Sequence, residues 1–70
     1  MQKIENIRRI DMFSAGPVFK MKISYKDGTS EDMSFFTFTG EGKEKLEGLK
    51  EFIKVNNLEE RCFLIKAWGK

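Results

Sequence analysis

The sequence contains no histidine and a single cysteine, Cys62, among its 70 residues. Because histidine is the most common general acid or base and the most common metal ligand in proteins, its absence removes the usual basis of a catalytic or metal site. Cys62 cannot form a disulfide within the chain, and its apolar neighbours favour a small buried side chain over a reactive thiol. We therefore expect no catalytic residue, no metal and no cofactor.

Two short segments have some features of a catalytic or phosphate-binding site but lack others that such a site requires. Glu31 and Asp32 are adjacent in a segment with strand character, so they point to opposite faces and cannot share a proton. Residues 40–43 precede a helical segment, as phosphate-binding loops do. However, Thr37 and Glu44 stand where such a loop requires glycine and a hydroxyl residue. Both segments are predicted to be ordinary surface structure.

Long hydrophobic runs are also absent, and none approaches the roughly 20 residues of a membrane-spanning helix. The composition, 40% hydrophobic and 34% charged, is typical of a globular protein. A net charge of +2 is too small to indicate nucleic-acid binding by itself. We expect one soluble, cytoplasmic domain over residues 1–70, and the preference for lysine over arginine favours a bacterial or phage origin.

A β-hairpin is the clearest local pattern. Residues 18–26 alternate strictly between apolar side chains and others, and residues 30–39 are rich in strand-forming phenylalanine and threonine. A two-residue loop between them would set Ile23 opposite Asp32, an apolar side chain against a charged one. A three-residue loop with Gly28 in the left-handed conformation would set apolar residues opposite each other. The sequence therefore predicts the three-residue loop.

The remaining segments suggest one helix and two further strands. Apolar side chains recur at helical spacing over residues 42–56, with Gly48 marking a close approach of the helix to the sheet. Residues 61–67 alternate as a strand does. The isoleucines of residues 4–13 recur every three residues, which suits a helix, but the short loop that follows favours a strand.

The predicted fold class is a small single α+β domain, with an antiparallel sheet in β-β-β-α-β order and one helix packed on one face. The expected core is apolar throughout and comprises Phe19, Met21, Ile23, Met33, Phe35, Leu46, Leu49, Phe52, Ile53, Phe63 and Ile65. One helix cannot cover both faces of a sheet. The second face is therefore expected to carry the residues that bind a partner.

These candidate partner-binding residues combine lysines with aromatic rings. They are Lys20, Lys22, Phe36, Phe38, Lys66 and Trp68. Exposed apolar patches commonly mark interaction sites, and tryptophan is enriched among residues that dominate binding energy. Lysines interleaved with aromatic rings on an open sheet also hold single-stranded nucleic acid.

The first functional hypothesis is a non-catalytic intracellular binding module, a small regulator or inhibitor that acts through protein–protein contact. Its partner is another protein or a second copy of the chain. A homodimer is expected because a small core without a disulfide is often completed by a second subunit. The alternative is a single-stranded nucleic-acid-binding protein that uses the lysine and aromatic face. No membrane partner is expected.

Overall fold

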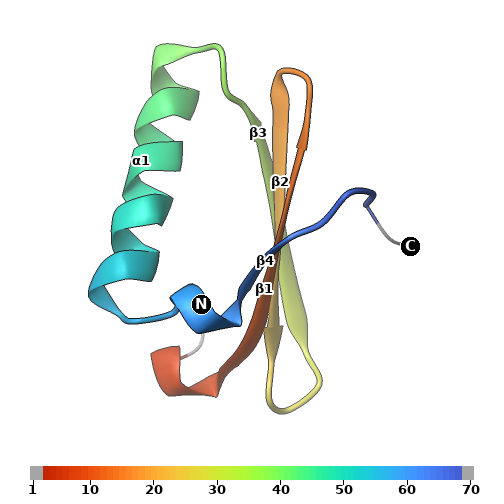
Figure 1. The fold of residues 1–70 in the computed structure, drawn as a ribbon, viewed down its shortest axis with the longest axis vertical. Coiled ribbons are helices and arrows are strands. Elements are labelled where there is room, and N and C mark those ends of the chain that lie inside the picture. The colour runs from red at the N-terminus through yellow and green to blue at the C-terminus, as the bar shows by residue number, and fades with distance from the viewer. Residues whose placement is uncertain (1–2, 69–70) are drawn as a thin grey trace.

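The computed structural model describes residues 3–68 and shows a four-stranded sheet with one helix on one of its faces (Figure 1). The elements are a 3-10 helix at Ile4–Asn6, β1 (Ile7–Ala15), β2 (Val18–Tyr25), β3 (Ser30–Phe36), α1 (Gly40–Val55), a second 3-10 helix at Glu59–Arg61, and β4 (Cys62–Leu64). The strands lie in the order β3-β2-β1-β4. The predicted α+β fold in β-β-β-α-β order is confirmed.

The direction of β4 makes the sheet mixed. The first three strands pair antiparallel, as predicted, whereas β4 runs parallel to β1. The 16 residues of α1 span about 24 Å, close to the length of about 23 Å of the seven-residue β3. The helix therefore returns the chain to the end of the sheet where β3 begins. The next strand must then run in the direction of β3, which is also the direction of β1.

The hairpin between β2 and β3 has the predicted register. Phe19 lies opposite Phe35, and the backbone N–H of Tyr25 donates a hydrogen bond of 2.9 Å to the carbonyl of Thr29. Gly28 has a φ of 92°, the left-handed conformation that the three-residue loop requires. This register brings both phenylalanine rings to the helix side of the sheet, where their centroids are 5.3 Å apart.

A bulge in β1 explains the ambiguous isoleucine spacing near the N-terminus. Residues three apart in a regular strand point to opposite faces. The register of β1 shifts between Ile7 and Arg9, and this irregularity returns Ile7 and Ile10 to the same face, where both are fully buried. The strand predicted over residues 4–13 is confirmed from Ile7 onward, whereas Ile4–Asn6 form a 3-10 helix.

Both ends of α1 are capped by side-chain and backbone hydrogen bonds. At its start, the hydroxyl of Thr39 accepts a hydrogen bond of 2.9 Å from the backbone N–H of Gly42. At its end, Asn57 adopts a φ of 57°, and the N–H of Leu58 donates to the carbonyl of Ile53. This is the Schellman arrangement, with Leu58 folding back as a buried apolar contact. Asparagine tolerates this left-handed conformation, so the helix ends at its cap residue Asn56.

The core lies between α1 and the sheet and is centred on β1 and β2. Its buried hydrophobic residues are Ile7, Ile10, Phe19, Met21, Ile23, Tyr25, Ile53 and Leu58. Phe35, Leu46, Leu49 and Phe52 are partly buried against it. Met33 and Phe63 were expected in the core, but they are 42% and 43% exposed. Ile65 is half-buried beyond the end of β4.

The error at Phe63 has a simple geometric origin. Alternation shows which residues of a strand share a face, but it does not show which face is turned inward. Cys62 and Leu64 are the residues of β4 that line the helix side. Phe63 is therefore on the other face, where the Arg9 guanidinium lies 4.2 Å from the centre of its ring.

Candidate binding face

The sheet face opposite α1, here called the open face, carries three cross-strand rows beyond a first one formed by Arg9, Ser24 and Ser30. The register places Asp11, Lys22 and Asp32 in one row, Phe13, Lys20 and Ser34 in the next, and Ala15, Val18 and Phe36 in the third. Lys20, Lys22 and Phe36 thus share this face, as the sequence predicted. These three rows differ in chemistry, because charged side chains fill the row of Asp11 and an aromatic ring stands in each of the other two.

Trp68 lies over the middle row of the open face. Its ring centroid is 6.2 Å from that of Phe13, and the Lys20 ammonium nitrogen is 5.6 Å from the centre of the Trp68 ring. The second distance is within the range of a cation–π interaction. The chain after β4 passes to the side of the sheet away from α1, which brings Trp68 to this position (Figure 1). Phe13 was not identified from the sequence, because the three-residue isoleucine spacing that precedes it left the faces of this strand unassigned.

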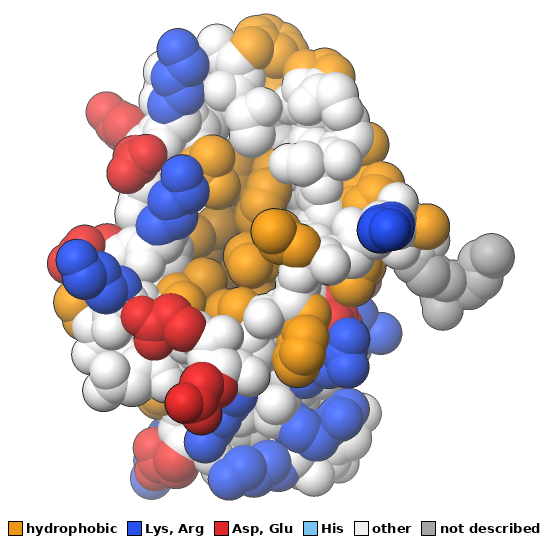
Figure 2. Space-filling view, viewed as in Figure 1, with side chains coloured by type: hydrophobic (Ala, Val, Ile, Leu, Met, Phe, Trp, Pro, Cys, Tyr) orange, Lys and Arg blue, Asp and Glu red, His pale blue; other side chains and the backbone are white. Residues whose placement is uncertain are grey.

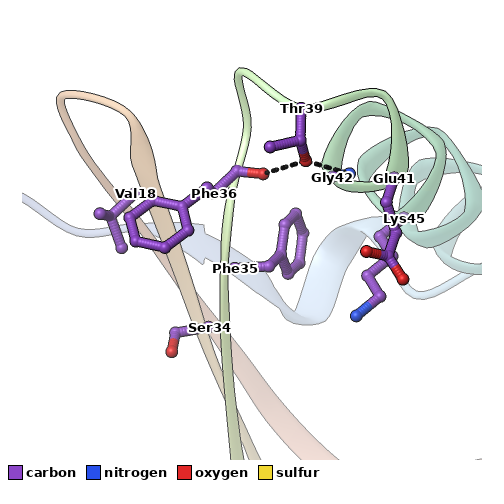
Figure 3. A pocket seen from close by; sticks show the side chains of 8 residues that line it. All are labelled: Val18, Ser34, Phe35, Phe36, Thr39, Glu41, Gly42 and Lys45. Atoms are coloured by element: carbon purple, nitrogen blue, oxygen red, sulfur yellow. Dashed lines mark hydrogen bonds between the residues drawn. The ribbon is translucent and has the colours of Figure 1, made fainter.

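A second aromatic pair lies where β3 ends. The rings of Phe36 and Phe38 are 5.4 Å apart, and these residues are 55% and 65% exposed. Beside them is a cavity of about 290 Å³ between the end of β3 and the start of α1. Figure 3 shows Val18 and Phe36 on one side of β3 and Phe35 on the helix side. The hydroxyl of Thr39 also donates to the Phe36 carbonyl, which fixes the chain between the two elements.

Acidic side chains lie among the lysines of the open face. Lys22 lies between Asp11 and Asp32 in the cross-strand register. Asp11 also accepts a hydrogen bond of 2.6 Å from the Arg9 guanidinium. Lys66 is exposed in the bend that precedes Trp68. The open face therefore carries mixed charge around its aromatic groups instead of a continuous positive surface.

A separate apolar groove opens between α1 and the sheet on the β4 side (Figure 2). It has a volume of about 380 Å³, and Met12, Leu46, Cys62 and Leu64 are among its lining residues. Burial raises the pKa of the Cys62 thiol, and the nearby Glu59 carboxylate raises it further by a smaller amount. A higher pKa leaves less reactive thiolate at neutral pH. This environment supports the expectation of an unreactive cysteine, which stays a prediction.

Residues 3–68 contain no group of three or more His, Cys, Asp or Glu side chains that could hold a metal ion. In the same part of the chain, no helix is long and apolar enough to cross a membrane. No protein-family model, curated protein or solved structure matches the chain. Inferences about function therefore depend on the geometry of the open face.

Proposed function

We propose that this protein is a non-catalytic binding module, a small cytoplasmic regulator or inhibitor that acts by docking its open face on another protein. The observation that carries this proposal is a group of aromatic side chains on a sheet face that α1 does not cover, of which Phe36 and Phe38 are exposed and Trp68 is half-buried. Trp68 is held between Phe13 and Lys20, and Phe36 contacts Phe38. Rings that are already ordered lose little side-chain entropy when a partner covers them.

The charges of the open face favour a protein over a nucleic acid. A single strand of nucleic acid requires positive groups that reach successive phosphates. Here Lys22 has an aspartate opposite it on each neighbouring strand, and those carboxylates would repel phosphate. A protein surface can match such mixed charge with groups of both signs at the rim of an apolar contact.

The test compares capture of binding partners by the wild-type protein and by variants of the open face. Trp68→Ala is expected to abolish capture of the partner while the protein remains folded, because Trp68 lies beyond the last strand. Leu64→Ala is the matched control, since Leu64 is 81% exposed and lines the other side of the sheet. Equal capture by wild type and Trp68→Ala, with circular dichroism showing both folded, would refute the proposal.

Single-stranded nucleic acid stays the second candidate because Lys20 lies against the Trp68 ring, the pairing of cation and aromatic surface used to stack bases. Fluorescence anisotropy with labelled single-stranded DNA and RNA distinguishes the two candidates. The expected result is no binding at physiological salt. Binding that weakens steeply with added salt and is lost in Lys20→Glu would instead assign the open face to nucleic acid.

A further inference from the structure

We propose that a second copy of this chain pairs with the free edge of β3. The two β3 strands would run antiparallel about a two-fold axis at Met33 and join two four-stranded sheets into one continuous sheet. This surface is the edge of the sheet that borders the open face, and the inference does not depend on the proposed function.

The edge of β3 is long and accessible. β3 is the outermost strand in the order β3-β2-β1-β4, and six of its seven residues are exposed. The hydrogen bond from Tyr25 to Thr29 shows which backbone groups of the hairpin face inward. Because hydrogen-bonded and non-hydrogen-bonded pairs alternate, the N–H and C=O groups of Ser30, Asp32 and Ser34 point away from β2. At the end of the strand, the carbonyl of Phe36 is instead held by the Thr39 hydroxyl. Such an edge is a template for another strand.

Only one register of this pairing matches charge and uses the whole strand. Residues whose backbone groups point away from β2 must lie opposite one another in the dimer. The two-fold axis therefore passes through Asp32, Met33 or Ser34. An axis at Asp32 sets two carboxylates opposite each other, which is destabilising. An axis at Ser34 sets Asp32 opposite Phe36 and leaves residues 30 and 31 unpaired. An axis at Met33 sets Asp32 opposite Ser34, whose hydroxyl can donate to the carboxylate. It extends the pairing from residue 30 to residue 36, where the Phe36 carbonyl alone is already held by Thr39.

The helix side of the edge is complementary in the same register. Met33 is 42% exposed there, beside a hollow of about 310 Å³ that is lined in part by Phe35, Lys45 and Leu49. The two Met33 side chains would meet at the axis and cover both hollows. Glu31 of the second copy would lie opposite Phe35, whose ring is 5.9 Å from the Lys45 ammonium nitrogen. Opposite charges are thus brought together across the interface.

This geometry also determines where the open faces lie. Met33 and Phe35 point to the helix side, and in the proposed register they meet helix-side residues of the second copy. Both α1 helices therefore lie on one side of the joined sheet, and both open faces form one surface on the other. A dimer of this kind presents two copies of the Trp68 and Phe36 groups to a partner, which strengthens binding through avidity.

Cysteine substitutions test the register directly. Three variants are made in a Cys62→Ser background: Asp32→Cys, Met33→Cys and Ser34→Cys. At the axis, the two Met33 Cα atoms would be about 4.5 Å apart, within the range of a disulfide. The two copies of either neighbour would be about 8 Å apart, which is too far. Mild oxidation is expected to give a covalent dimer with Met33→Cys alone. Covalent dimers formed only through Asp32→Cys or Ser34→Cys would overturn the register.

Light scattering tests the dimer without a cross-link. The wild-type protein is expected to have twice the chain mass of 8.2 kDa at high micromolar concentration. Ser34→Pro removes an N–H that points away from β2 and is expected to give a folded monomer, whereas Ser34→Ala retains the dimer. A monomeric wild-type protein, or a dimer that persists in Ser34→Pro, would overturn the proposal.

Discussion

Two glycines of α1 have different surroundings, and this difference was not visible in the sequence. A Cβ atom at Gly42 would collide with the backbone carbonyl of Phe36, whereas a Cβ atom at Gly48 would meet nothing within 4 Å. The close approach of helix to sheet expected at Gly48 is therefore wrong and occurs at Gly42. Gly42 lies in the first turn of α1, where Thr39 ties the helix to the end of β3. The apolar spacing of a helix cannot show this contact, because it depends on how the chain turns between β3 and α1.

Alanine substitutions at these two positions should have opposite effects on stability. Gly48→Ala is expected to raise the free energy of unfolding by about 1 kcal/mol, because alanine favours the helix and meets open space. Gly42→Ala gains the same propensity but forces the helix away from Phe36, so we expect a net loss. Urea unfolding followed by circular dichroism measures both values. Equal stability of the two variants would contradict the packing at Gly42.

The individual residues of the open face were predictable from the sequence to different degrees. Lys20 and Phe36 were placed correctly on one face because the hairpin register follows from local side-chain chemistry. Phe13 was missed because the bulge between Ile7 and Arg9 gave the preceding isoleucines a helix-like spacing, so no faces were assigned to this strand. Trp68 reaches the open face because the chain bends after Leu64, where the strand alternation ends. Alternation beyond the true end of a strand therefore has no predictive value.

At the scale of elements, the sequence contained more information than the antiparallel prediction used. A helix about as long as β3 returns the chain to the start of that strand, which requires a parallel β4. Helix and strand lengths alone would have given this result. The faces of β4 were less accessible to prediction, because three residues, Cys62–Leu64, alternate equally well in either orientation. Short strands contain too few residues to identify the buried face.

The connection between β3 and α1 should depend on one hydroxyl. The Thr39 side chain accepts from the Gly42 N–H and donates to the Phe36 carbonyl. Thr39→Ala removes both bonds and should lower the free energy of unfolding by about 1 kcal/mol. Thr39→Ser keeps the hydroxyl and should remain close to wild type. Urea denaturation measures the difference, and identical midpoints for the two variants would show that the cap contributes nothing.

For the whole molecule, the helix covers only the centre of the sheet. Its contacts with the core come from one stripe of side chains, of which only Ile53 is buried. The apolar groove remains on the β4 side and the hollow beside Met33 on the β3 side. A core of this size, without a disulfide, supplies only about 3–5 kcal/mol of stability. The fold is therefore sensitive to the loss of any single contact between α1 and the sheet.

Ile53→Ala tests this sensitivity and also its link to self-association. Removing a buried isoleucine side chain costs about 2–5 kcal/mol, which is comparable to the whole stability of the domain, so the variant should be largely unfolded when dilute. Leu64→Ala, at an 81% exposed position, should melt close to wild type. Because association through β3 favours only the folded chain, the melting temperature of Ile53→Ala should rise with protein concentration. If Ile53→Ala instead unfolds cooperatively at the wild-type melting temperature, the Ile53 contact contributes little to the fold and other contacts hold α1 on the sheet.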